Sequence, residues 1–125
     1  MSNIPQGNDL DLSFLTEIAD GSNEFIIESI DMFLQQTPEL LGAITEAIST
    51  QDWPATATAA HKLKPNLGFF GMPISQEIMQ GIELSAKSGA PDATELSSKF
   101  EEARQIISAN LITLSKIKKE KEAES

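Results

Sequence analysis

The sequence predicts an all-α fold, an antiparallel up-and-down four-helix bundle with a short extra N-terminal helix. Apolar residues recur every three or four positions through nearly the whole chain, which is the period of a helix. Glycine and proline gather at a few points that divide this pattern into one short and four long segments. A chain of 125 residues can form one modest core, and no internal repeat indicates a second domain.

The dipeptide Asp20-Gly21 separates the first two expected helices. The short one covers about residues 10–19, and the long one runs from an N-cap at Ser22 to about residue 48. Pro38 interrupts the long helix. Because the apolar stripe resumes in phase beyond this proline, we expect a kink there and not a break.

Three further helices follow, each with a recognisable start. Asp52 is the expected N-cap of a helix that ends near residues 70–71. The next helix begins at Pro73 and ends at about Lys87, and the last begins after the loop 88–91. The apolar stripe of the last helix consists of Leu96, Phe100, Ala103, Ile107, Leu114 and Ile117.

These boundaries divide the chain into three parts. Residues 1–9 are an N-terminal extension, residues 10–119 form the bundle, and residues 120–125 are a tail that we expect to fray. Residues 1–10 lack the basic and apolar pattern of a signal peptide, so we expect the protein to stay in the cytoplasm.

Composition excludes several classes of function. The chain has no cysteine, which removes disulfides and thiol chemistry and fits a reducing compartment. A net charge of −10 argues against nucleic acid, whose phosphates this surface would repel. No apolar stretch is long enough to span a membrane, no metal site is expected around one imidazole, and nothing requires more than a monomer.

The single histidine, His61, lies midway along its predicted helix. The apolar stripe of that helix turns the imidazole outward, and we expect small residues at positions 57 and 68 to leave open surface beside it. Lys64, three residues on, lies next to any group attached to the ring. An ammonium there stabilises a dianionic phosphoryl group.

The following helix supplies a carboxylate for the ring. If the turn between the two helices centres near Met72, then His61 and Glu83, each eleven residues from it, lie level. A carboxylate at that level accepts the Nδ1 proton and leaves Nε2 with a free lone pair. Lys87, one turn beyond Glu83, adds a second cation on the same face.

This pattern resembles the histidine phosphotransfer (HPt) family over about residues 14–114. The family motif has a histidine, an aliphatic residue at +2, Lys at +3, Gly at +4, a small residue near +7 and Gly at +10. The corresponding residues here are His61, Leu63, Lys64, Pro65, Gly68 and Gly71.

The resemblance implies a bacterial phosphorelay protein. Its histidine carries a phosphoryl group on Nε2 and exchanges it with aspartates of response-regulator receiver domains or a hybrid histidine kinase. A Gln or Glu at the position of Glu83 orients the ring, and some members have a basic residue at the position of Lys87. Such a protein has no kinase activity and no cofactor of its own, because the receiver supplies the aspartate and Mg²⁺.

Pro65 departs from the motif glycine. A proline inside a helix removes one hydrogen bond and clashes with the carbonyl four residues earlier, here that of His61, at a cost of about 3 kcal/mol. We therefore expect the helix to bend or widen one turn from the histidine. The residues expected to dock a receiver, or to let it approach closely, are Leu15, Ile18, Thr58, Pro65, Gly68 and Phe69.

Two other functions are compatible with the same residues. The bundle can be the phospho-accepting domain of a histidine kinase, phosphorylated from ATP by a separate catalytic domain. It can also be a binding or scaffold module in which the histidine is incidental and Pro65 marks lost phosphotransfer.

Overall fold

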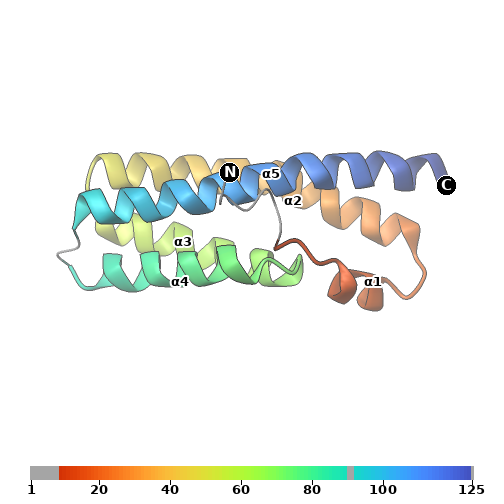
Figure 1. Ribbon diagram of the computed structural model, residues 1–125, viewed down its shortest axis with the longest axis horizontal. Coiled ribbons are helices and arrows are strands. Elements are labelled where there is room, and N and C mark those ends of the chain that lie inside the picture. Colours follow the sequence, from red (N-terminus) through yellow and green to blue (C-terminus); the bar gives the residue numbers. More distant parts are fainter. Residues whose placement is uncertain (1–8, 90–91, 125) are drawn as a thin grey trace, which may run out of the picture.

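The computed structural model describes residues 9–89 and 92–124, and these contain five helices and no strand. They are α1 (Ser13–Ala19), α2 (Asn23–Ser49), α3 (Trp53–Phe69), α4 (Pro73–Lys87) and α5 (Ala93–Glu124). The four long helices form an elongated bundle in which α2 and α4 each pack against both α3 and α5 (Figure 1). The predicted all-α bundle with a short leading helix is confirmed.

The predicted helix starts are confirmed by hydrogen bonds. Ser22 Oγ accepts the backbone N–H of Phe25 at 3.1 Å, and Asp52 Oδ1 accepts that of Ala55 at 3.1 Å. The predicted stop after α1 is also present, because Asp20 adopts a left-handed conformation with φ of 49°. The long helix α2 continues through Pro38 without a break, as its apolar stripe predicted.

The core lies along the axis of the bundle, and every long helix contributes to it. The predicted stripe of α5 is buried from Leu96 to Leu114, and Ile117 is partly buried. The largest apolar side chains without solvent contact are Leu15, Ile30, Ile44, Leu63, Leu67, Met72, Met79, Ile82, Ile106, Ile107 and Leu114. No described helix is long and apolar enough to cross a membrane.

The bundle begins earlier than predicted. Asp9, assigned to the N-terminal extension, is buried and joins two distant helices. Its Oδ2 accepts the backbone N–H of Ser75 at 2.9 Å, and its Oδ1 accepts Asn110 Nδ2 at 2.8 Å. Because α4 has no N-cap side chain of its own, Asp9 satisfies one of its free N–H groups from outside the helix. Residues 1–8 lie outside the described part.

The last helix also continues further than predicted. We expected residues 120–125 to fray, but α5 is helical to Glu124, and residue 125 lies outside the described part. Two contacts with α2 explain the extension. Asn23 Nδ2 donates to the carbonyl of Lys121 at 3.1 Å, and Lys118 forms an ion pair with Asp31 at 3.7 Å. Within α5, Lys118 also pairs with Glu122.

The segment before α1 lies against the turn between α3 and α4. Gly71 in this turn has φ of 66°, and a Cβ there would come within 1.9 Å of the carbonyl oxygen of Asp11. Only glycine allows both this conformation and this approach. The turn is thereby fixed, and it sets the register of α3 against α4.

Candidate functional site

His61 projects from the middle of α3 into solvent. Its neighbours Ala60 and Leu63 are fully buried, so the helix presents His61 on its outer face. The His61 side chain is 69% exposed, which confirms its predicted orientation. A partner molecule therefore has direct access to the imidazole.

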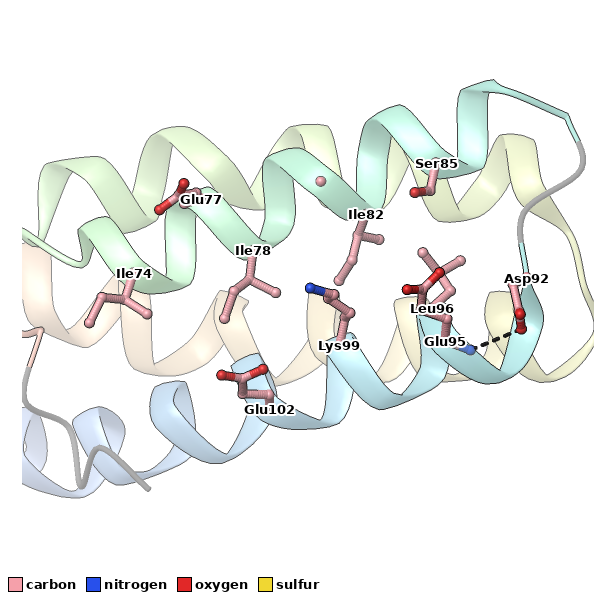
Figure 2. A pocket seen from close by; sticks show the side chains of 11 residues that line it. Ile74, Glu77, Ile78, Ile82, Ser85, Asp92, Glu95, Leu96, Lys99 and Glu102 are labelled. Carbon is pink, nitrogen blue, oxygen red and sulfur yellow. Dashed lines mark hydrogen bonds between the residues drawn. The ribbon is translucent and has the colours of Figure 1, made fainter. Parts of the chain in front are cut away.

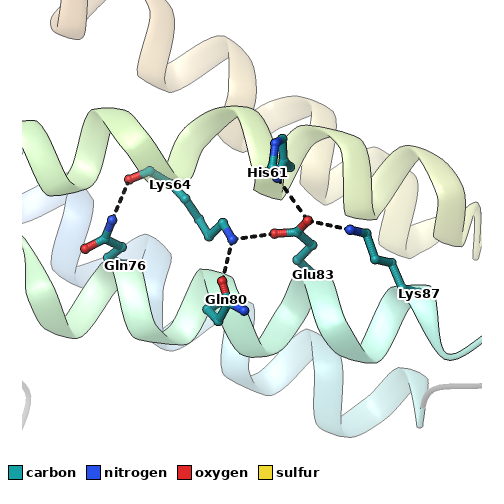
Figure 3. A network of polar contacts seen from close by, with 6 residues as sticks. All are labelled: His61, Lys64, Gln76, Gln80, Glu83 and Lys87. Carbon is teal, nitrogen blue, oxygen red and sulfur yellow. Dashed lines mark hydrogen bonds and ion pairs between the residues drawn. The ribbon is translucent and has the colours of Figure 1, made fainter.

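Glu83 on α4 lies behind the ring. Its Oε2 is 3.0 Å from His61 Nδ1 (Figure 3), while its side chain is only 4% exposed. The two residues are equidistant in sequence from Met72, and the antiparallel pair of helices brings them level, as predicted. The rest of the ring, including Nε2, faces away from this contact.

Two lysines also contact the Glu83 carboxylate. Lys64 Nζ lies 2.7 Å from Oε1, and Lys87 Nζ lies 2.9 Å from Oε2 (Figure 3). Gln80 accepts a second hydrogen bond from Lys64 through its side-chain oxygen. Gln80 was not among the residues predicted from the sequence, although its position three residues before Glu83 places it on the same helix face.

The lysines keep Glu83 ionised. Hydrogen bonds from Lys64 and then from Lys87 lower the pKa of Glu83 to about 2, against the opposing effect of its burial. An ionised carboxylate can only accept a hydrogen bond, so His61 Nδ1 carries the proton in this contact. In the neutral ring, Nε2 then holds the lone pair.

The small residues of α3 serve packing, which corrects the expectation that they leave open surface. Ala57 is buried. At Gly68 a Cβ would lie 2.7 Å from Gln76 Nε2, so the Gln76 side chain from α4 occupies this space. Gln76 Nε2 donates to the carbonyl of Lys64 at 3.2 Å, next to Pro65 (Figure 3). The surface of α3 at Gly68 is therefore covered by a side chain of α4 and is not open to a partner.

The apolar residues expected to dock a receiver differ in exposure: one is buried in the core and the others are exposed or partly buried. Leu15 is fully buried and belongs to the core, so its assignment to the docking surface is wrong. Ile18 is 46% exposed, and Phe14, one turn before it, is 50% exposed. Phe14 packs edge-on against the partly buried Phe69 with ring centroids 5.5 Å apart. The exposed apolar residues of α1 are therefore Phe14 and Ile18, and Leu15 is not among them.

Pro65 and Thr58 are both exposed on α3, on either side of His61 in sequence. The helix remains continuous through Pro65 from Trp53 to Phe69. Among the described residues no group of three or more His, Asp or Glu side chains is arranged to hold a metal ion.

The fold and the site together define a helical bundle that presents one carboxylate-backed histidine on its surface. A family model described as Hpt domain matches residues 28–114, which is more than half of the chain. The chain therefore belongs to the Hpt domain family, whose members act in phosphotransfer in two-component signalling and interact with receiver domains and kinases. No curated protein and no solved structure gives a significant match.

Proposed function

We propose that this protein relays a phosphoryl group between receiver-domain aspartates, with His61 Nε2 as the carrier atom. The observation that carries this proposal is the exposed His61 ring whose Nδ1 lies 3.0 Å from the ionised Glu83. This contact selects the tautomer with a nucleophilic Nε2. Membership of the Hpt domain family supports the same reaction.

The transfer step requires no proton to leave the ring. The Nε2 lone pair attacks the phosphorus of a receiver aspartyl phosphate, the N–P bond forms, and the P–O bond to the aspartate breaks. The aspartate leaves as a carboxylate, and the ring, which keeps its Nδ1 proton, becomes a phosphorylated imidazolium. Glu83 faces the positive charge that develops on the ring and stabilises it. Transfer to the second receiver reverses these steps.

Lys64 and Lys87 share the carboxylate partner of His61, and two ammonium groups this close to the ring support a site for a negatively charged phosphoryl group. Both ammonium groups contact the carboxylate that contacts the ring. We propose that Lys64 moves from Glu83 to the phosphoryl oxygens when His61 is loaded, because a dianion attracts the ammonium strongly. Lys87 then remains with Glu83.

The receivers complete the reaction in this proposal. They supply the aspartate and the Mg²⁺, and the protein acts in the cytoplasm as a monomeric phosphocarrier without kinase activity of its own. Phe14, Ile18 and Phe69 form the apolar docking surface, in which Phe14 contacts Phe69 at the C-terminal end of α3. Thr58 and Pro65 lie on the same helix as the histidine.

The direct test is incubation with a receiver domain that carries labelled aspartyl phosphate. We expect acid-labile, alkali-stable label on the wild-type protein and none on His61→Gln. Full label on His61→Gln would overturn the assignment of His61.

A parallel reaction with ATP and a histidine-kinase catalytic domain separates the two phosphorylated alternatives. Faster labelling from ATP than from the receiver would favour the kinase-domain function. No labelling from either donor, with partner binding unchanged in His61→Ala, would favour the scaffold function.

A further inference from the structure

A concave surface that does not include His61 lies between α4 and α5. It is a groove of about 400 Å³ with an apolar floor that includes Ile78, Ile82 and Leu96 (Figure 2). Ile74 stands at one end and is 42% exposed. This volume is within the range of sites that hold part of a ligand or a partner side-chain cluster.

The rim of the groove is strongly acidic. Its charged residues are Glu77, Asp92, Glu95 and Glu102, opposed by Lys99 alone (Figure 2). Four carboxylates and one ammonium leave three net negative charges. Within residues 9–89 and 92–124, none of these five side chains forms an ion pair. Asp92 Oδ1 accepts the backbone N–H groups of Thr94 and Glu95 at the start of α5, at 3.0 and 3.1 Å, so part of its hydrogen-bonding capacity is already used. The carboxylates of Glu77, Glu95 and Glu102 are available to an incoming group.

The groove exists because α4 has small residues where it faces α5. Gly81 and Ser85, one turn apart, line its wall. A Cβ at Gly81 would meet no atom within 4 Å, so the position opens into free space. A glycine inside a helix weakens that helix relative to alanine, and no neighbouring atom requires one here. The missing side chain keeps this part of the groove open.

The groove and the His61 site use opposite faces of α4. At 100° per residue, Gln80, Glu83 and Lys87 fall on the face toward α3, whereas Gly81 and Ser85 fall on the other side. Figure 3 shows Gln80, Glu83 and Lys87 pointing toward α3, whereas Figure 2 shows Ile78 and Ile82 pointing toward α5. A molecule in the groove therefore leaves His61 free.

We propose that this groove binds a basic amphipathic helix of a partner protein. An apolar stripe of such a helix fills the floor over Ile78 and Leu96, and Lys or Arg residues on both flanks meet the rim carboxylates. Gly81 admits a large side chain of the partner. The groove is thus a tethering surface that holds the protein near a partner while His61 exchanges phosphoryl groups; its existence does not depend on that exchange.

The test uses a fluorescein-labelled model helix of about 18 residues made of Leu and Lys in helical spacing. Fluorescence anisotropy measures its affinity, and NMR shift mapping of the isotope-labelled protein locates it. Shifts should concentrate on groove residues such as Ile78, Gly81 and Leu96. A peptide of the same composition in scrambled order, and one with Glu in place of Lys, should bind at least tenfold more weakly.

Gly81→Leu fills the groove and should weaken binding of the model helix at least tenfold while phosphoryl acceptance by His61 stays unchanged. Gly42→Leu is the matched control, because Gly42 is also an exposed helical glycine with free space at Cβ. Glu95→Gln combined with Glu102→Gln should weaken binding about threefold at low salt, which tests the rim without adding bulk.

Three results would overturn the proposal. They are shifts spread over the whole acidic surface, equal losses in Gly81→Leu and Gly42→Leu, and a concentration-dependent dimer that Gly81→Leu abolishes. The last result would assign the groove to a second copy of this chain. Thermal unfolding of each variant checks that lost binding does not reflect lost folding.

Discussion

Replacing Glu83 by Gln tests the charge arrangement behind His61. The pKa of Glu83 is lowered from 4.5 to about 2, and this difference corresponds to about 3 kcal/mol at about 1.4 kcal/mol for each pH unit. Because the Lys87 side chain is 60% exposed, solvent screens part of this interaction. We therefore expect Glu83→Gln to lower the free energy of unfolding by about 1–2 kcal/mol at neutral pH.

The pH dependence carries a definite sign. A carboxylate whose pKa is lower in the folded state than in the unfolded state stabilises the folded state. This stabilisation is complete at pH values above the pKa of the unfolded state, and it is lost as the pH falls through the pKa of the folded state. The difference between wild type and Glu83→Gln should therefore be full above about pH 4.5 and shrink toward zero near about pH 2.

Urea unfolding, followed by the fluorescence of the single tryptophan, Trp53, measures this difference at each pH. Glu28→Gln is the control, since Glu28 is exposed and has no ion pair in the described part of the chain; it should change stability by less than about 0.5 kcal/mol at neutral pH. A difference for Glu83→Gln that stays constant from about pH 7 to about pH 2.5 would refute the electrostatic reasoning.

Three further predictions concern the stability of the bundle and are measured by the same urea unfolding. Pro65→Gly should raise the free energy of unfolding by up to about 2 kcal/mol, since relative to alanine a proline inside a helix costs about 3 kcal/mol and a glycine about 1 kcal/mol. A large loss of stability in this variant would mean that α3 requires the proline. Asp9→Ala should lower it by about 2–3 kcal/mol, because the buried N–H of Ser75 loses its acceptor, and wild-type stability would contradict that role. Leu15→Ala should cost about 2–5 kcal/mol, whereas Ile18→Ala should cost less than about 1 kcal/mol and weaken receiver binding; equal costs would contradict their different burial.

Local chemistry made much of the fold predictable. Ser22 and Asp52 each bond a backbone N–H three residues later, so a short stretch of sequence contains the complete signal. The pairing of His61 with Glu83 was also predictable, because a tight turn between antiparallel helices fixes which residues lie level. Both inferences need only the helical period and the position of the turn.

The errors arose where contacts span long distances in sequence or where a helix is short. Asp9 bonds residues 66 and 101 positions away, and no local pattern indicates such partners. In the seven-residue α1, the buried pair Leu15 and Ala19 and the exposed pair Phe14 and Ile18 have the same spacing. Its apolar pattern therefore fits two rotations of the helix, and only packing decides between them.

The position of Lys64 between two acceptors has a consequence for the energy of the loaded state. In the unphosphorylated protein this ammonium is already bound to Glu83 and Gln80, so it must give up those contacts before it can serve a phosphoryl group. Under the proposed function, phosphorylation of His61 replaces the contacts of Lys64 with Glu83 and Gln80 by contacts with the phosphoryl oxygens, so the number of contacts that Lys64 makes changes little. Such an exchange keeps the empty and loaded forms close in free energy, as a reversible carrier requires. Lys64→Met should therefore shift the equilibrium between the two forms less than it slows the approach to that equilibrium.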